Sequence, residues 1–358
     1  MVEMSMARDY DLAIVGGGIL GAWTLYLAQQ RFPHWRIGLI ERFRIGDGAT
    51  AHSAGVLVAT GSTSRERRLA EFSAERYRQI RQSLELRTTA ADVFWVTEAA
   101  HEHDLRQMAV DFTIDVERLS PHVLRDRLTA PLELGATEIL LRGGSAVAHD
   151  PGAIARGLIG ASMRSPQVTC VEGAGVRGLD IGAAGVALRL DDGSAMRSAR
   201  VVVAAGPWLA GEPFAALSPT RSLRIKKVVA LHVDLIPPPD AAAVFFPQSD
   251  AYLMPMPARN QWLFSFRADE WDCLPFKHAL EISAHDRQIA MRIIERYQPG
   301  ASRACRGGRV FCDAYTPNGE PIVERVPDAP VVVAGGGSGA GFRLSPGLAD
   351  EALRCLDA

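Results

Sequence analysis

The chain has 358 residues, more than a single hydrophobic core usually organises, so we expect two domains. Its 47% hydrophobic and 22% charged residues exclude a globally disordered chain, and its net charge of -2 excludes the strongly basic surface of a nucleic-acid-binding protein. No apolar stretch is long enough to span a membrane, and no signal peptide is visible before the first expected strand, so we predict a cytoplasmic protein.

The five cysteines are odd in number and have no CxxC spacing. This pattern suits a reducing compartment better than a disulfide framework. We predict no metal site.

The first expected element is a buried strand at Leu12–Val15, followed by a glycine turn and an apolar helix at Ile19–Gln30. A second strand, RIGLIE at Arg36–Glu41, ends in an acid. The order of strand, glycine turn, helix and strand is the fingerprint of a dinucleotide-binding βαβ unit.

Each glycine of this turn has a distinct expected role. Gly16 permits the tight turn, Gly18 lets the backbone approach a pyrophosphate, and Gly21 lets the helix pack closely on the strand. Glu41 can accept both hydroxyls of an adenosine ribose and would repel a 2′-phosphate, which disfavours NADP. The alternative is a plain glycine turn between a strand and a helix.

The middle of the chain predicts a helix and then a group of short strands. Residues 63–85 form an amphipathic helix that opens with a capping box of Thr63 and Glu66. From Val168 the pattern changes to short strands, two of which are joined by a hairpin turn at Asp192 and Gly193.

The last third of the chain adds further strands and ends in a second glycine unit. The strand in ARVVVAAGPW stops at Gly206, as a strand does when its tip meets a ligand. Strands are expected in AYLMPMP and QWLFSFRAD, and a helix at His278–Tyr297. Residues 331–347, VVVAGGGSGAGFRLSPG, repeat the order of strand, glycine turn and helix.

Five stretches in this order resemble the D-amino acid oxidase family of FAD-dependent oxidoreductases, in particular its glycine oxidase and sarcosine oxidase branch. They are IVGGGILG, LIERFRIGDGATAHSAGVL, VVVAAGPW, YTPNGEPIV and VVVAGGGSGAGFRLSPG. The first stretch is shared by many nucleotide-binding proteins, whereas the ordered set is specific to this family.

The resemblance implies an α/β fold with two domains. One is a Rossmann-like FAD-binding domain of the glutathione-reductase type, and the other is an α+β substrate domain with a mostly antiparallel sheet. We expect the FAD-binding domain in residues 1–90, 145–220 and 300–358, and the substrate domain in residues 91–144 and 221–299.

The resemblance also implies FAD as the cofactor, held at its pyrophosphate by the opening glycine unit and at its isoalloxazine by the closing one. The helix that begins near Phe342 would direct its positive end at the flavin N1 and O2 atoms. An NAD domain would finish within the first half of the chain and leave the closing unit without a role. The cofactor contacts implied are Gly16, Gly18, Ile19, Leu20, Gly21, Glu41, Arg42, Ala49, Thr50, Ala51, His52, Ser53, Ala54, Gly55, Val176, Ala205, Gly206, Trp208, Gly337, Ser338, Gly339, Ala340, Gly341, Phe342 and Arg343.

The reaction implied is oxidation of a primary or secondary amine, with an amino acid as the expected substrate, to an imine. Hydride passes to flavin N5, and water hydrolyses the imine. Arg343 follows GxGF, where related proteins bind the substrate carboxylate, and its alternative role is a solvent-facing arginine. Tyr252 matches a tyrosine of the substrate pocket or packs in the core. His52 is a flavin contact, a base or a packed histidine.

One strand departs from the family pattern. Glycine oxidase-like proteins have an arginine where this chain has Asp313. On a strand, Arg309, Phe311, Asp313 and Tyr315 share a face. Arg309 and Asp313 therefore either form a structural pair or leave Asp313 to recognise a cationic part of the substrate.

The same strand bears on how FAD is held. The sarcosine oxidase branch attaches its flavin to a cysteine in this stretch, and the matching position here is Phe311. Cys312 is expected to point to the opposite face of the strand. We therefore predict noncovalent FAD.

The positions of the lysines indicate which electron acceptor the enzyme uses. Related oxidases place a lysine over the flavin in the strand that matches QWLFSFRAD, which has none, and Lys226, Lys227 and Lys277 are expected elsewhere. A dehydrogenase is favoured over an oxidase, with oxygen, a quinone or an electron-transfer protein as acceptor. The alternative functions are an NAD-linked dehydrogenase and a noncatalytic or electron-relaying flavin subunit of a larger complex.

Overall fold

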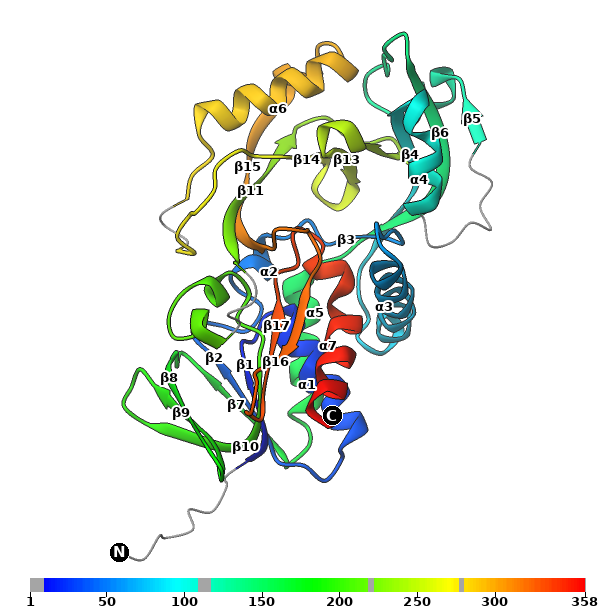
Figure 1. Ribbon diagram of the computed structural model, residues 1–358. Coiled ribbons are helices and arrows are strands. Elements are labelled where there is room, and N and C mark those ends of the chain that lie inside the picture. Colours follow the sequence, from blue (N-terminus) through cyan, green and yellow to red (C-terminus); the bar gives the residue numbers. More distant parts are fainter. Residues whose placement is uncertain (1–9, 109–116, 218–221, 277–279, 358) are drawn as a thin grey trace, which may run out of the picture.

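The protein is described by a computed structural model that covers residues 10–108, 117–217, 222–276 and 280–357. Two β-sheets lie one above the other, with helices beside each of them (Figure 1). This mixed α/β architecture agrees with the fold class predicted from the sequence.

The lower sheet in Figure 1, here called sheet A, has a parallel centre. Its parallel strands, in spatial order, are β17 (Val331–Gly335), β10 (Ala195–Val203), β1 (Tyr10–Val15), β2 (Ile37–Glu41) and β7 (Val168–Glu172). Three antiparallel strands complete it: β16 (Ile322–Arg325), β8 (Val176–Gly182) and β9 (Gly185–Leu190).

Both faces of sheet A are covered. On one face, Leu12 and Ile14 of β1 pack against the helices α1 (Ile19–Arg31), α5 (Pro151–Ser162) and α7 (Gly341–Asp357). On the other face, Ala13 and Val15 pack against the β8–β9 hairpin. Burial on both sides explains why these strands are continuous apolar runs rather than alternating ones.

The upper sheet, here called sheet B, is antiparallel except for one parallel pair between β4 and β12. Its strands, in spatial order, are β15 (Cys305–Tyr315), β11 (Arg224–Val233), β14 (Gln261–Phe266), β13 (Ala251–Met256), β12 (Ala243–Phe246), β4 (Thr89–Glu98), β6 (Glu138–Ala148) and β3 (Val56–Val58), with β5 (Glu117–Leu119) paired to β6. Helix α6 (Ala284–Tyr297) packs on this sheet through Ala290 and Ile294.

The other α-helices of the described chain are α2 (Ala49–His52), α3 (Ser64–Ser83) and α4 (Glu102–Met108). Helix α2 leads from β2 of sheet A to β3 of sheet B. At the start of α3 the Thr63 hydroxyl accepts the backbone N–H of Glu66, as expected. The Glu66 carboxylate instead accepts the N–H of Ser62, 2.7 Å away, so the capping box is only half formed.

Helix α6 begins later than the sequence pattern indicated. The expected start at His278 lies outside the described residues, and residues 280–283 are not helical. The helix begins at Ala284, because Ser283 and Asp286 form a complete capping box there.

The predicted domain boundaries stay a prediction, and the strand pairing differs from them at more than one place. They assign residues 1–90, 145–220 and 300–358 to the FAD-binding domain, whereas β3, the end of β6 and β15 all pair within sheet B. Within the described residues, no helix has the length and apolar character that a membrane span requires.

Candidate active site

The carboxyl ends of the central strands of sheet A meet at one edge, which faces sheet B. Strand β1 lies between β2 and β10 there, so the connections diverge to either side, as they do at the ligand sites of open α/β sheets. A cavity of about 490 Å³ lies at this edge. Gly18 of the opening turn and Gly339 of the closing turn both line it.

The opening turn depends on close backbone contacts. A Cβ atom on Gly16 would lie 2.5 Å from the Ala204 carbonyl oxygen, and one on Gly21 would lie 1.8 Å from the Gly16 carbonyl oxygen. Gly21 does not line the cavity. It brings α1 against the turn, which is the packing role expected for the third glycine.

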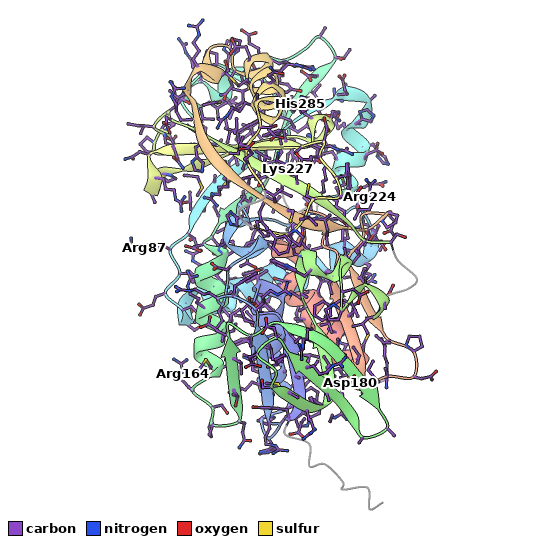
Figure 2. All side chains as sticks on the ribbon, turned by 90° about the vertical axis from the view of Figure 1, so that its left-hand side faces the viewer. Arg87, Arg164, Asp180, Arg224, Lys227 and His285 are labelled. Carbon is purple, nitrogen blue, oxygen red and sulfur yellow. The ribbon has the colours of Figure 1, made fainter. Side chains whose placement is uncertain are left out.

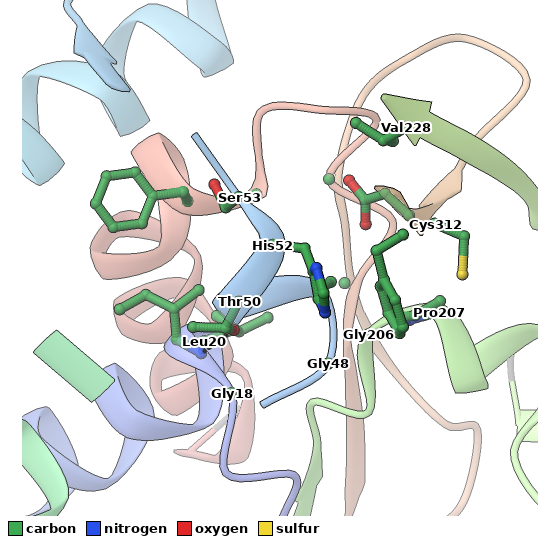
Figure 3. A pocket seen from close by; sticks show the side chains of 18 of the residues that line it. Gly18, Leu20, Gly48, Thr50, His52, Ser53, Gly206, Pro207, Val228 and Cys312 are labelled. Carbon is green, nitrogen blue, oxygen red and sulfur yellow. Dashed lines mark hydrogen bonds between the residues drawn. The ribbon is translucent and has the colours of Figure 1, made fainter. Parts of the chain in front are cut away.

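The start of α1 points into the cavity. Gly18 is the N-cap and provides no side-chain acceptor, while Thr50 on α2 accepts the N–H of Ile19 at 2.9 Å. Figure 3 shows Gly18, Leu20 and Thr50 together on this side of the cavity. The positive end of the helix therefore faces the space where an anionic ligand would be stabilised.

Glu41 closes the opening turn from the tip of β2. Its carboxylate accepts the N–H of Gly17 at 2.6 Å and the N–H of Phe43 at 2.8 Å. Burial raises the pKa of Glu41, and the two backbone hydrogen bonds oppose that effect. Each carboxylate oxygen keeps a further lone pair, so Glu41 can still accept hydrogen bonds from hydroxyl groups in the cavity.

The closing turn is held by β15 rather than by its own neighbours in sequence. Ser338 and Gly339 both have left-handed backbones, with φ of 48° and 86°. The Ser338 N–H donates to the Ala314 carbonyl at 3.1 Å, and the Gly339 N–H donates to the Asp313 carboxylate at 3.0 Å. These bonds fix the turn to the last residues of the strand.

One of the two alternatives for this strand, a structural pair between Arg309 and Asp313, is not present in the described part of the chain. The second carboxylate oxygen of Asp313 accepts the N–H of Ala314 at 2.8 Å, and burial raises the pKa of this acid. The Arg309 guanidinium donates instead to the Ser53 carbonyl at 3.0 Å, and burial lowers the pKa of Arg309. Backbone N–H groups therefore bind the Asp313 carboxylate in place of Arg309.

The face of sheet B toward the cavity carries the side chains that alternation predicted. Arg309, Phe311, Asp313 and Tyr315 all line the cavity. Neighbouring strands add Lys226, Val228 and Ala230 from β11, Tyr252 from β13 and Ser265 from β14.

His52 has a packing contact on this wall. Its imidazole ring stacks on the Phe311 ring, with 5.0 Å between centroids and 8° between planes. In Figure 3 the His52 side chain extends from α2 across the cavity. The contact agrees with the packed histidine that the sequence left open.

Arg343 lies in the first turn of α7 and lines the cavity. One of its guanidinium nitrogens donates to the Thr60 carbonyl. Burial lowers the pKa of Arg343, and the charge of Glu66 opposes that effect. The beginning of α7 is anchored by Tyr77, whose hydroxyl donates to the Phe342 carbonyl at 2.7 Å.

Cys312 also borders the cavity, which strand alternation did not predict. Figure 3 places it beside Pro207. The side chain is 1% exposed, and burial raises the pKa of its thiol to about 12. At neutral pH this thiol is protonated and is a poor nucleophile.

Of the residues predicted to contact the cofactor, those that line the cavity are Gly16, Gly18, Ile19, Leu20, Glu41, Arg42, Ala49, Thr50, His52, Ser53, Ala54, Gly55, Val176, Ala205, Gly206, Trp208, Gly337, Ser338, Gly339, Ala340, Gly341, Phe342 and Arg343. The two others, Gly21 and Ala51, do not line it.

Two lysines on the cavity wall were not expected there. Lys226 and Lys227 of β11 both line it. Lys227 is held away as a structural cation, because its ammonium lies 2.8 Å from Asp286 and 2.9 Å from Glu270. A signal was present in the sequence, since adjacent lysines inside the apolar strand RIKKVVALHV require one of them to face inward.

A sequence model of the FAD dependent oxidoreductase family, DAO, matches residues 11–354. The chain belongs to this family. The family consists of FAD-dependent oxidoreductases, so this chain belongs to an enzyme family whose cofactor is FAD. A search of curated protein sequences found no match.

Solved structures of this family's fold superimpose over almost the whole chain. Glycine oxidase from Geobacillus kaustophilus has a TM-score of 0.79 at 20% identity, covering 98% of this chain and 95% of its own. L-proline dehydrogenase from P. horikoshii has a TM-score of 0.81 at 14% identity, covering 98% and 94%. L-α-glycerophosphate oxidase from Mycoplasma pneumoniae, solved with FAD bound, has a TM-score of 0.77 at 16% identity, covering 98% and 95%. These likenesses establish the fold.

The residues around the cavity of this FAD dependent oxidoreductase fit the family's cofactor. Gly18 presents a helix start with no side-chain cap, which suits a pyrophosphate. On the wall, the buried indole N–H of Trp208 has no hydrogen-bond partner among the described residues, so a donor remains for a ligand. A Cβ atom on Gly48 would meet the Trp208 ring at 3.2 Å, so this glycine keeps the loop close to the indole.

Proposed function

We propose that this chain oxidises a primary or secondary amine, with an amino acid as the expected substrate, using FAD held noncovalently in the cavity. The supporting observation is that both glycine turns line one cavity whose opposite wall is the polar face of sheet B. When bound, FAD would accept a hydride at N5, and water would hydrolyse the resulting imine.

The opening and closing turns would hold opposite ends of the cofactor. The start of α1 at Gly18 would meet the pyrophosphate, and Glu41 would accept the ribose hydroxyls. The turn at Gly339 and the start of α7 would face the isoalloxazine. The protonated state of Cys312 supports noncovalent attachment.

The substrate would lie between the cofactor and sheet B. Arg343 is our proposed carboxylate contact, because its bond to the Thr60 carbonyl leaves further N–H donors on the guanidinium. Tyr252, Arg309 and Tyr315 would line the substrate space. Asp313 would act through the closing turn, because both of its oxygens accept backbone N–H groups.

The names of two related structures support an amino acid substrate. Glycine oxidase and L-proline dehydrogenase are named for amino acids, whereas L-α-glycerophosphate oxidase, with the same fold, is named for an alcohol. The fold therefore permits both chemistries, and the substrate must be found by experiment.

A dehydrogenase remains our proposal over an oxidase, with a quinone or an electron-transfer protein as acceptor. The expectation that all three lysines lie away from the site was wrong, because Lys226 and Lys227 line the cavity and Lys277 lies outside the described residues. The preference now rests on β14, whose cavity-lining residues are Ser265 and Phe266 rather than a lysine. Rapid recovery of the flavin spectrum when air is mixed with the reduced protein would reverse it.

The function is tested with the purified full chain. We expect about one FAD per chain, released by acid precipitation, and bleaching of the flavin by at least one amine or amino acid in an anaerobic screen. A protein without flavin absorbance would support the NAD-linked alternative. A protein that holds FAD but is bleached by no amine would support a noncatalytic or electron-relaying subunit.

A further inference from the structure

Lys226 differs from Lys227, Arg309 and Arg343 on the cavity wall because its ammonium has no polar partner among the described residues. The residue is 4% exposed, yet within the described residues it donates no side-chain hydrogen bond and forms no ion pair. Its neighbours Arg309 and Lys227 do have such partners. The Lys226 side chain is largely buried and lines the cavity, so an anionic ligand there would stabilise its charge.

Two aromatic rings hold the Lys226 ammonium in place. It lies 5.3 Å from the centroid of Trp271 and 5.1 Å from that of Tyr315. The two rings meet edge to face, with 5.5 Å between their centroids. Cation–π contacts of this kind orient the ammonium and leave its N–H groups available to a ligand in the cavity.

The nearest acids on the sheet do not neutralise this charge. Asp313 is the cross-strand neighbour of Lys226, but its carboxylate is bonded to the backbone N–H groups of Ala314 and Gly339. Asp250 and Asp269 act on the ammonium only at a distance, and Arg267 opposes them. Burial and Arg267 lower the pKa of Lys226.

We propose that Lys226 binds a carboxylate of the substrate through its unpaired ammonium and so makes the enzyme specific for amines that carry an acid group. This inference rests on the proposed function. The oxidised isoalloxazine is uncharged and would leave the ammonium uncompensated, whereas a carboxylate would neutralise it. Arg343, on α7, is available for a second acidic group, which makes dicarboxylic amino acids the substrates to test first.

Lys226→Met is the decisive variant, because it keeps the length of the side chain, removes the charge and retains favourable contacts with the two rings. Arg224→Met is the matched control. Arg224 lies two residues away on β11 and also stacks on Trp271, at 4.8 Å, but it is paired with Asp272 and does not line the cavity. Arg224 and Lys227 mark this part of the strand in Figure 2.

The experiment measures the binding of acetate and succinate to the FAD-containing protein, by flavin absorbance and by calorimetry. We expect Lys226→Met to weaken the tighter carboxylate at least about tenfold. Arg224→Met and Lys226→Arg should stay within about threefold of the natural protein. Once a substrate is known, the preference in kcat/KM for the amino acid over its decarboxylated amine should fall by a similar factor in Lys226→Met.

Three results would overturn the assignment. They are unchanged carboxylate affinity in Lys226→Met, no binding of either carboxylate by the natural protein, or a shift in the flavin reduction potential without loss of carboxylate affinity. The last would place the lysine against the flavin instead. If the purified protein contains no FAD, the proposed function is contradicted. The calorimetric measurement of carboxylate binding would still test the role of Lys226.

Discussion

The opening and closing glycine turns line the same cavity, but different parts of the chain hold them. The opening turn is closed by residues near it in sequence: Gly21 packs on the Gly16 carbonyl, and Glu41 accepts the Gly17 N–H. The closing turn is held by a strand of the other sheet, where Asp313 accepts the Gly339 N–H. A turn of the first kind can be recognised from a short motif, whereas one of the second kind depends on the partner strand.

The glycines of the two turns also serve different purposes. In the opening turn the glycine at position 21 is required because backbone approaches backbone. In the closing turn the glycine at position 339 is required mainly by its left-handed φ of 86°, and its nearest neighbour would be the Tyr315 hydroxyl. Substitutions should therefore damage the opening turn more than the closing one.

The largest effect is expected from Gly21→Ala. The new Cβ atom would lie 1.8 Å from the Gly16 carbonyl oxygen, so the helix and the turn must separate. We expect the free energy of unfolding to fall by about 3 kcal/mol or more, with loss of bound FAD. Urea unfolding and flavin content measure both.

Gly160→Ala is the control for this change. Gly160 is exposed on α5, and its Cβ atom would meet nothing within 4 Å. This variant should gain about 0.5–1 kcal/mol, because alanine favours a helix over glycine. Equal stability of the two variants would contradict the account of the opening turn.

The next largest effect is expected at His149, which packs against Phe342 at the start of α7. His149 is 8% exposed and lies between the rings of Tyr77 and Phe342, and burial lowers its pKa from the ordinary value of 6.5 to about 4. The unfolded chain binds a proton at His149 more tightly than the folded chain does. The contribution of neutral His149 to the free energy of unfolding is therefore present above pH 6.5 and is lost as pH falls to 4. At about 1.4 kcal/mol for each pH unit, the loss is about 3 kcal/mol.

His149→Phe removes the titrating group and keeps a ring in the site. We expect its unfolding free energy to decline less steeply than that of the natural protein between pH 6.5 and pH 4, as measured by urea unfolding at each pH. Parallel pH profiles of the two proteins would show that His149 does not contribute.

A smaller effect is expected at the bond that joins the closing turn to β15. Asp313→Ala leaves the Gly339 N–H without its acceptor and should cost about 2 kcal/mol of unfolding free energy. Asp313→Asn keeps an acceptor oxygen and should cost less. If both variants unfold at the same urea concentration, the bond to Gly339 does not hold the turn.

A comparison of Asp313→Asn with the natural protein tests the charge of Asp313. Burial raises its pKa, so the folded state binds the proton more tightly than the unfolded state. Its contribution therefore favours folding at low pH and is lost as pH rises through the raised pKa. Relative to the natural protein, Asp313→Asn should become more stable as pH rises from acidic to neutral.

The smallest effect is expected from Gly339→Ala, which imposes a side chain on a left-handed backbone. It should cost about 1–2 kcal/mol and weaken FAD retention without unfolding the protein. Gly341→Ala is the control, because its Cβ atom would meet nothing within 4 Å at the start of α7. A thermal unfolding comparison in which the control loses more stability would contradict the distinction.

Much of the site was predictable because its residues sit at the ends of recognisable elements. The turn glycines follow buried strands, and alternation correctly placed Arg309, Phe311, Asp313 and Tyr315 on one face. The hydrogen-bond partners of these residues were less predictable. Asp313 bonds to the closing turn rather than to Arg309, because the turn backbone reaches its carboxylate.

The lysines and Cys312 show a second limit. Lys226 was expected away from the site, yet it lines the cavity because β11 lies between β15 and β14 in sheet B. Cys312 borders the cavity, although strand alternation predicted that it points to the opposite face. Strand order across a sheet is set by contacts far apart in sequence, and periodicity within one strand carries no information about it.

The sequence by itself determined the family, the fold class and the presence of two glycine turns, because these depend on motifs and periodicities that are local to the chain. Only the tertiary structure decided that Gly18 and Gly339 share a cavity, that Asp313 holds the closing turn, and that Lys226 faces the cavity without a polar partner. Those facts depend on which strand lies beside which, and on which side chains the folded protein shields from water.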